Sequence, residues 1–365
     1  MRFTFVSKLV FSFLAVACLS VAADDPNLSP VGMVYTMTNA VSGNSVLALF
    51  RSPDGRLSPA RTYPTGGMGT GAELGSQGSL VLSRNQRWLF AVDAGSSEIS
   101  VFQVTGNGLL LSSIVGSGGS TPVSVAFNGR LLYVVNSGSD NIAGFRLLGN
   151  GKLIPIPGSI QQLSGTGVGP AQISFNPEGD TLVVTEKSTN LITTFLIGSG
   201  GAAMPGVSQA SAGMTPFGFA FGRRSQFFVS EAFGGATNAS ALSSYRLADD
   251  GTIHTITGSL ANNQSAACWV VTDPGGRFAY VSNTGSNTIS SYRIAFDGSL
   301  TLSAAQAAQT GGAPADSALS GDGRMLYVLN GDGSINGFRV MANGQLMSVS
   351  TVSGLPAGTA GLAAL

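Results

Sequence analysis

Short apolar runs separated by turn residues fill most of the chain, and residues 122–156 show the pattern most clearly. β-branched and aromatic residues dominate four consecutive runs there, at residues 122–127, 131–136, 142–147 and 152–156. Asn128-Gly129 separates the first two runs and Asn150-Gly151 the last two. Such dipeptides tolerate the positive φ angles that tight hairpins require. Because no stretch shows a helical period, the pattern predicts a four-stranded antiparallel meander.

The same meander recurs along the chain. An aromatic residue followed in most copies by arginine marks the third run of each copy. The seven pairs are Phe50-Arg51, Phe102-Gln103, Phe145-Arg146, Phe195-Leu196, Tyr245-Arg246, Tyr292-Arg293 and Phe338-Arg339, at intervals of 43 to 52 residues. A four-stranded repeat of this length is typical of β-propeller blades, so the sequence predicts an all-β, seven-bladed propeller. We expect the recurring arginines to lie on the outer surface.

The two ends of the repeat indicate how the ring closes. The first copy begins at its second run, residues 33–39, whereas residues 356–365 resemble a first run with no copy after it. Pairing the two segments would complete blade one and cover two strand edges that would otherwise promote aggregation. We therefore expect the C-terminal strand to close the ring in blade one.

The N-terminus has the pattern of a secretory signal. An apolar run at residues 9–21 follows Arg2 and Lys8 and precedes Ala22 and Ala23, and it is too short to span a bilayer. We expect a cleaved signal peptide at residues 1–23 and a secreted propeller at residues 24–365, with no membrane span. Cleavage would leave Cys268 as the only cysteine, so no intramolecular disulfide could form.

The composition disfavours several classes of function. Charged residues make up 10% of the chain, with 18 basic and 18 acidic residues, and no basic run is present to bind nucleic acid. A single histidine and a single mature cysteine argue against most His- or Cys-based metal sites, although oxygen ligands leave calcium open. The sequence therefore predicts no cofactor, no resident metal and no nucleic-acid partner, and we expect a monomer.

One segment carries a family resemblance. Residues 169–179 read Gly-Pro-Ala-Gln-Ile-Ser-Phe-Asn-Pro-Glu-Gly, and residues 182–186 read Leu-Val-Val-Thr-Glu. Together with Tyr-Val-Val-Asn at residues 133–136, they resemble the seven-bladed lactonase family, which includes 6-phosphogluconolactonases and carboxymuconate lactonizing enzymes. The resemblance extends over all seven copies. It implies a propeller fold and either lactone hydrolysis or muconate-type lactonization.

The chain departs from the family at one position. The resemblance implies a histidine after Pro170, a proposed catalytic residue of the family, but this chain has Ala171 there. The only histidine, His254, follows a hairpin, and we expect it to face solvent on an outer strand. The glutamate that the lactonizing enzymes carry after the second strand of the next blade is matched by Glu231.

Polar residues end the predicted second strands, on the face where the first strands begin. In order they are Asn39, Asp93, Asn136, Glu186, Glu231, Asn283 and Asn330. Short Asn and Asp side chains are typical of turns, whereas Glu is less suited to them. Glu186 and Glu231, in neighbouring blades, are therefore the predicted catalytic residues, one of them acting as general base in a central funnel.

The starts of the first strands add predicted substrate-binding residues on the same face. These are Gln77, Gln172, Phe217, Trp269 and Asp316, and Lys187 would stabilise developing negative charge. Such a funnel would suit a small lactone or sugar-acid-like ligand. Two hypotheses remain open at this point: a metal-independent lactonase or lactonizing enzyme, and a secreted binding propeller that has lost the family histidine.

Overall fold

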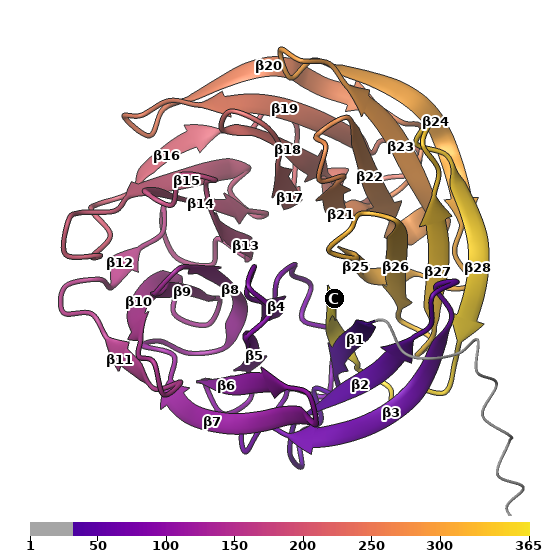
Figure 1. The fold of residues 1–365 in the computed structure, drawn as a ribbon. Helices are drawn as coiled ribbons and strands as arrows, with labels where there is room; N and C mark the ends of the chain where they lie inside the picture. Colours follow the sequence, from indigo (N-terminus) through magenta and orange to yellow (C-terminus); the bar gives the residue numbers. More distant parts are fainter. Residues whose placement is uncertain (1–31) are drawn as a thin grey trace, which may run out of the picture.

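Seven antiparallel sheets surround a central axis in the computed structural model, which describes residues 32–365 (Figure 1). From the inside outward, blade one contains β29 (Ala360–Ala364), β1 (Gly32–Met37), β2 (Ser45–Arg51) and β3 (Leu57–Pro64). Blade two contains β4 (Leu80–Leu82), β5 (Trp88–Asp93), β6 (Glu98–Thr105) and β7 (Gly108–Gly116). Blade three contains β8 (Pro122–Asn128), β9 (Leu131–Asn136), β10 (Asn141–Leu147) and β11 (Leu153–Pro155), and β12 (Gln161–Gln162) also pairs with β10.

The remaining blades follow the same order. Blade four contains β13 (Pro170–Phe175), β14 (Thr181–Glu186), β15 (Leu191–Leu196) and β16 (Val207–Ala210). Blade five contains β17 (Pro216–Phe221), β18 (Gln226–Glu231), β19 (Ala241–Leu247) and β20 (Ile253–Ala261). Blade six contains β21 (Ala267–Thr272), β22 (Phe278–Asn283), β23 (Thr288–Ile294) and β24 (Leu300–Gln309). Blade seven contains β25 (Pro314–Leu319), β26 (Met325–Asn330), β27 (Ile335–Val340) and β28 (Leu346–Val352).

This architecture confirms the predicted seven-bladed, all-β fold. Among residues 32–365, the only helical elements are two short 3₁₀ turns, η2 (Phe233–Gly235) and η3 (Thr284–Ser286). The predicted signal peptide, residues 1–23, lies outside the described residues. Within residues 32–365, no helix has the length and apolar character needed to cross a membrane.

The C-terminal strand closes the ring, as predicted. β29 pairs with β1 in antiparallel register, with Tyr35 opposite Ala363 and Thr36 opposite Leu362. The N–H of Leu362 also donates to Oδ2 of Asp316 on β25, at 2.9 Å. β29 is therefore held by β1 within its own blade and by the innermost strand of blade seven.

The second strand is the most deeply buried strand in most blades. Every residue of β5, β14, β18, β22 and β26 is buried, because a second strand has neighbouring strands on both edges and neighbouring blades on both faces. Strands buried on both faces carry continuous apolar runs, which explains why these segments showed the repeat most clearly in the sequence. Outer strands such as β20 alternate between exposed and partly buried residues.

Tyrosine hydroxyls on three second strands join each of these blades to the next. Each hydroxyl donates to a glycine carbonyl in the hairpin between the third and fourth strands of the following blade. The pairs are Tyr133 with Gly201 (2.7 Å), Tyr280 with Gly344 (3.0 Å) and Tyr327 with Gly55 (2.9 Å). These glycines have φ angles of 84°, 84° and 94°, a region that disfavours side chains. Asp54-Gly55, Asn343-Gly344 and the Gly200-Gly201 pair in blade four thus shape both the hairpins and the contacts between blades.

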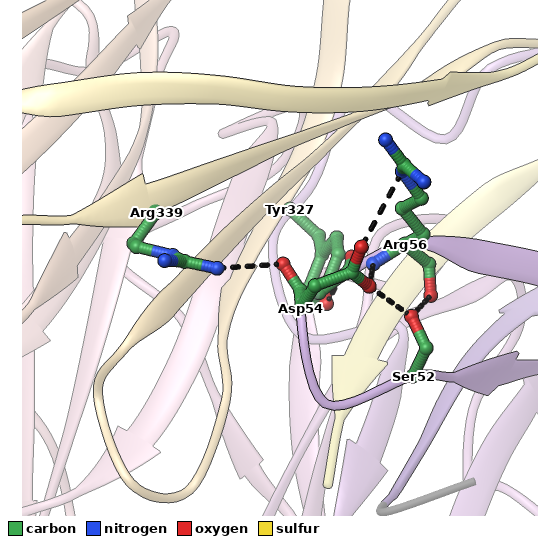
Figure 2. A network of polar contacts seen from close by, with 6 residues as sticks. Ser52, Asp54, Arg56, Tyr327 and Arg339 are labelled. Atoms are coloured by element: carbon green, nitrogen blue, oxygen red, sulfur yellow. Dashed lines mark hydrogen bonds and ion pairs between the residues drawn. The ribbon is translucent and has the colours of Figure 1, made fainter. Parts of the chain in front are cut away.

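Figure 2 shows this contact between blades seven and one. Arg339 donates from Nη2 to the carbonyl oxygen of Asp54 at 3.1 Å, beside the bond from Tyr327 to Gly55. Within the hairpin, Ser52 Oγ donates to Asp54 Oδ1 at 2.5 Å, and Arg56 Nε lies 3.5 Å from Oδ2. The hairpin is therefore braced internally while its carbonyl groups bind the neighbouring blade.

Deletion of residues 356–365 tests the closure. The truncated chain would lose β29, leave the inner edge of β1 unpaired and remove the bond from Leu362 to Asp316. We expect insolubility, or a fall in melting temperature of at least roughly 10 °C, because several kcal/mol of burial and ladder hydrogen bonds disappear. Differential scanning calorimetry measures this effect. A truncated protein that melts with the full-length chain would show that another segment closes the ring.

Candidate functional site

The connector from blade one to blade two enters the central channel and contacts blades four and six. β3 ends at Pro64 and β4 begins at Leu80, and part of the intervening chain, residues 73–79, is called the channel segment below (Figure 1). Gln77 donates its backbone N–H to Ala171 O on β13 at 3.0 Å. Its side-chain amide donates to Val270 O on β21 at 2.8 Å and accepts from Val270 N at 3.1 Å. Because Gln77 contacts the innermost strands of both blade four and blade six, it must lie within the channel.

Aromatic side chains line one side of the channel segment. Trp269 Nε1 donates to Ser76 O at 3.1 Å, and the rings of Phe217 and Trp269 meet edge to face with centroids 5.4 Å apart. These two residues form a buried cluster with Ala171 and Cys268. Burial raises the pKa of the Cys268 thiol to about 12, so the thiol stays protonated near neutral pH. The cluster is therefore a buried apolar surface, and its thiol is not a thiolate nucleophile.

Ala171 occupies the position where the family resemblance implies a histidine. Its side chain is fully buried in this cluster, and its carbonyl oxygen accepts the bond from Gln77. The small residue therefore lies where the channel segment docks. The single histidine, His254, is exposed on the outer strand β20, as expected from the sequence.

Lys187 lies directly after β14 at the edge of the aromatic wall. Its Nζ donates to Gly75 O at 2.6 Å and lies 4.8 Å from the centroid of the Phe217 ring. Burial lowers the pKa of Lys187 from its usual 10.5, while the negative charge of Glu73 opposes that shift. Lys187 is thus a partly desolvated cation held between the channel segment and an aromatic face.

Glu73, at the start of the channel segment, was not identified from the sequence. Its side chain is exposed, yet partial burial raises its pKa above the usual 4.5, and Lys187 opposes the shift. Glu73 and Lys187 therefore each favour the charged form of the other, although within residues 32–365 no ion pair joins them at 4 Å or less. The signal available in the sequence was the long, glycine-rich connector between the first two copies of the repeat.

The two predicted catalytic glutamates lie elsewhere. Glu186 is fully buried, and its oxygens accept bonds from Thr193 Oγ1 (2.6 Å), Thr189 Oγ1 (2.9 Å), Ser164 N (3.2 Å) and Ser164 Oγ. Glu231 is also fully buried and accepts from Ser243 Oγ. Burial raises the pKa of Glu231, and the bond from Ser243 is the largest opposing effect. The Glu186 carboxylate is bound within its own blade and by the connector that precedes it, whereas Glu231 accepts through Oε1 from its own blade and its Oε2 is buried without a hydrogen-bond partner among residues 32–365.

The same position in other blades makes similar bonds. In blade two, Asp93 accepts from Thr65 Oγ1 (2.6 Å), Ser100 Oγ (2.6 Å) and Asn44 Nδ2 (2.9 Å). In blade six, Asn283 Nδ2 donates to Ser290 Oγ at 2.9 Å. The position therefore serves to tie the second and third strands to the connector. This geometry favours the same structural role for Glu186 and Glu231, whose catalytic role stays a prediction.

The predicted binding residues fall into two groups. Gln77, Lys187, Phe217 and Trp269 come together around the channel segment through the contacts described above. By contrast, Gln172 Oε1 accepts from Phe219 N at 2.6 Å, which joins β13 to β17. Asp316 accepts from Ser317 N at 2.7 Å and from Leu362 N at the closure of the ring. Gln172 and Asp316 therefore link neighbouring inner strands.

Within residues 32–365, no three His, Cys, Asp or Glu side chains are grouped in the way that a metal site requires. The functional groups at the mouth of the channel are the carboxylate of Glu73, the ammonium group of Lys187 and the aromatic ring of Phe217. A partly desolvated base beside a cation can activate water toward a carbonyl carbon and stabilise the oxyanion that forms.

Comparison with known proteins identifies the family. The model of the family described as lactonase, seven-bladed β-propeller, matches residues 32–168 and 236–360. The chain therefore belongs to the seven-bladed β-propeller lactonase family. Lys187, Phe217, Glu186 and Glu231 lie in the interval between the two matched ranges, so the family pattern is not matched at part of the candidate site. No curated protein sequence matches the chain.

Solved structures with the same fold are distant in sequence. A Bacteroides fragilis protein provisionally named a 6-phosphogluconolactonase is 18% identical, with a TM-score of 0.74, over 92% of this chain and 98% of that one. The periplasmic gluconolactonase of Pseudomonas aeruginosa is 17% identical, with a TM-score of 0.68, over 91% and 99%. A hypothetical selenium-binding protein of Sulfolobus tokodaii is 12% identical, with a TM-score of 0.67, over 92% and 93%. At these identities the likeness shows the fold alone.

The position of Asp316 predicts how stability depends on pH. Burial raises its pKa to about 8, against the opposing bonds from Ser317 and Leu362, whereas the unperturbed value is 3.8. The folded protein then retains a proton that the unfolded chain loses, so the free energy of unfolding should fall as pH rises from about 4 to about 8, by at most roughly 1.4 kcal/mol per pH unit.

Asp316→Asn should remove this contribution and flatten the dependence. Urea denaturation at several pH values measures it. Asp322→Asn is a matched control on the same blade, and it should leave the fall between pH 4 and 8 in place, because Asp322 has a lowered pKa. An Asp316→Asn variant with an unchanged pH dependence would contradict the assignment.

Proposed function

We propose that this chain hydrolyses a small lactone at the mouth of the channel, with Glu73 as general base and Lys187 as the group that stabilises the oxyanion. The observation that supports this most is the partly desolvated Lys187 ammonium, which is held by the Phe217 ring and by Gly75 O, two residues along the channel segment from the exposed Glu73. Membership of the lactonase family supports the reaction class. A sugar-acid-like lactone suits the site, because an aromatic face beside charged groups can hold a polar ring.

The reaction would proceed through a tetrahedral intermediate. Glu73 accepts a proton from water as the water oxygen attacks the lactone carbonyl carbon. The ammonium group of Lys187 stabilises the negative charge that forms on the carbonyl oxygen. Collapse of the intermediate breaks the bond between the carbonyl carbon and the ring oxygen, and protonated Glu73 returns its proton to the leaving oxygen. The product is a hydroxy acid, and Glu73 returns to its starting state.

Solvent access distinguishes Glu73 from the two glutamates predicted from the sequence. Glu186 and Glu231 have exposed fractions of 0%, and their carboxylates accept bonds from Ser and Thr hydroxyls. A general base must reach the water that it activates, either directly or through one other water. Glu73 meets this requirement without rearrangement of a blade.

A binding propeller without catalytic activity is the second candidate. Ala171 stands in place of the family histidine, and the channel segment fills the channel at the depth of Gln77. Under this alternative, Lys187, Phe217 and Glu73 would recognise a ligand at the mouth of the channel without turning it over.

Export is part of the proposal. It rests on the apolar run at residues 9–21 and the small residues that follow it. N-terminal sequencing of the protein recovered from the culture medium or the periplasm should place the first residue near Asp24. A protein that retains Met1 or stays in the cytoplasm would contradict export.

Replacing Glu73 with Gln tests the mechanism. The change keeps size and hydrogen bonding but removes the base, so kcat on a panel of five- and six-membered lactones should fall about 10²–10⁴-fold. Because the pKa of Glu73 is raised, the wild-type rate should increase with pH through a value above 4.5. The Glu73→Gln variant should not show this increase of rate with pH.

Glu186→Gln and Glu231→Gln are the comparison variants. We expect each to retain kcat, and Glu186→Gln to lower the melting temperature because Ser164 N loses a charged acceptor. Loss of kcat in these two variants, with Glu73→Gln fully active, would instead support the hypothesis drawn from the sequence. Wild-type protein that binds lactones without turnover would favour the binding propeller.

A further inference from the structure

Arginines gather around a cleft on the face opposite the channel mouth. The cleft is about 830 Å³ and lies among the hairpins of blades six, seven and one. Its charged lining residues are Arg51, Arg277, Arg324, Arg339, Asp273 and Asp322. The hairpins between first and second strands, and between third and fourth strands, lie at the end of the blades away from Glu73 and Lys187. The cleft is therefore distinct from the proposed lactone site.

The two aspartates of the cleft are bound within their own hairpins. Asp273 Oδ1 accepts from Arg277 N (2.5 Å) and Phe278 N (2.7 Å). Asp322 Oδ1 accepts from Ser320 Oγ (2.5 Å) and Arg324 N (3.1 Å). Turn N–H groups and the Ser320 hydroxyl thus bind one oxygen of each carboxylate, and Arg277 Nε lies 3.4 Å from Asp273 Oδ2. Four guanidinium groups still stand against two carboxylates. In a chain with equal numbers of basic and acidic residues, this is a local excess of positive charge.

Arg51 is the most unusual of the four arginines. The expectation of an outer-surface position is confirmed for Arg146, Arg246 and Arg293, which are exposed, but it is wrong for Arg51, which is only 8% exposed. The closure of blade one explains the difference, because Arg51 Nη2 donates to Leu365 O at 3.0 Å, just beyond β29. A Cβ atom at Gly32 would lie 2.9 Å from Nε, so the glycine lets the guanidinium pack against the backbone.

The Nε atom of Arg51 is buried without a hydrogen-bond partner among residues 32–365. A buried cationic donor left without an acceptor costs free energy that an oxyanion would recover. Burial would by itself raise the pKa of Asp322, but bonds from Ser320 and Arg324 and the charges of Arg51 and Arg324 hold it below its usual value. The charges of Arg51 and Arg324 therefore act on the same part of the cleft.

Arg339 and Arg277 complete the lining. Arg339 uses Nη2 to bind Asp54 O (Figure 2), and Arg277 lies over the Phe278 ring with its Cζ atom 5.4 Å from the centroid. Contacts of this kind hold guanidinium groups in fixed orientations, which lowers the entropic cost of binding an anion. Planar guanidinium groups bind phosphate and carboxylate oxygens in bidentate geometry.

We propose that this cleft between blades six, seven and one is a binding site for a small multivalent oxyanion, in which the guanidinium groups of Arg51 and Arg324 together bind the anion. The volume suits a ligand the size of a sugar phosphate, a sulfated sugar or a polycarboxylate. The shared chemistry is two or more anionic oxygens placed close together.

Isothermal titration calorimetry of the full chain at low ionic strength tests the site with three probes: inorganic phosphate, sulfate and citrate. We expect at least one probe to bind. The probe that binds most strongly shows whether the site prefers a tetrahedral oxyanion or a carboxylate. Arg324→Gln, at an exposed position that should not disturb folding, should weaken binding about tenfold or more, because charge-assisted hydrogen bonds are lost. Arg51→Gln should weaken binding further where the variant folds.

Arg146→Gln is the matched control. Arg146 occupies in blade three the third-strand position that Arg51 and Arg339 occupy in blades one and seven. It binds Gly200 O in the next blade at 2.9 Å but lies outside the cleft. Its replacement should leave binding unchanged, as should Glu73→Gln. The proposal is overturned if none of the three probes binds the wild-type protein below about 10 mM, a strength that corresponds to roughly 3 kcal/mol. It is also overturned if Arg146→Gln weakens binding as much as Arg324→Gln, since only net charge would then matter.

Discussion

Pairing of β29 with β1 is the constraint on which the ring depends. A propeller blade cannot cover both of its own faces, so each blade is stable only between two neighbours. The last blade therefore has to meet the first, and here the chain achieves this by building blade one from both ends. The bond from Leu362 to Asp316 and the bond from Tyr327 to Gly55 then join this composite blade to blade seven on its inner and outer sides.

The channel depends on the closed ring. Only in a closed ring do the innermost strands of blades four and six lie close enough for one glutamine residue to bind both, through its backbone N–H and its side chain. The channel segment occupies this position, and it carries Glu73 toward Lys187 and Phe217. The proposed chemistry thus lies on a connector supported by inner strands, an arrangement that combines a rigid scaffold with a loop-borne reactive group. The arginine cleft depends on the same closure, since Arg51 binds the carbonyl oxygen of Leu365, directly after the C-terminal strand.

Much of the fold could be predicted from the sequence because the repeat is local. In blade three the predicted runs 122–127 and 131–136 correspond to β8 and β9 within one residue at each boundary. The predicted fourth run, 152–156, also corresponds to β11 (Leu153–Pro155) within one residue, but the outer edge of the blade continues after an interruption in β12 (Gln161–Gln162), which pairs separately with β10. Pro155 and Pro157 account for the interruption, because proline cannot donate to a strand ladder.

The site was harder to predict, because contacts across the ring leave no periodic signal. Lys187, Phe217 and Trp269 lie at repeat positions, so their shared face could be inferred. Glu73 lies in a connector outside the repeat, and the bond of Gln77 to Val270 joins residues 193 positions apart. The second-strand glutamates occupy a repeat position that other blades fill with Asp and Asn, and their hydroxyl partners come from separate strands and connectors. Sequence spacing alone could not distinguish a buried structural carboxylate from an exposed base.

A crystal structure with a bound lactam analogue of a lactone tests the central claim most directly. The amide ring resists hydrolysis but presents the same carbonyl group. The account predicts that the ring lies against Phe217, with its carbonyl oxygen within hydrogen-bond distance of Lys187 Nζ and its carbonyl carbon close to the Glu73 carboxylate. A lactam bound instead beside Glu186 or Glu231, or in the arginine cleft, would contradict the placement of catalysis at the mouth of the channel.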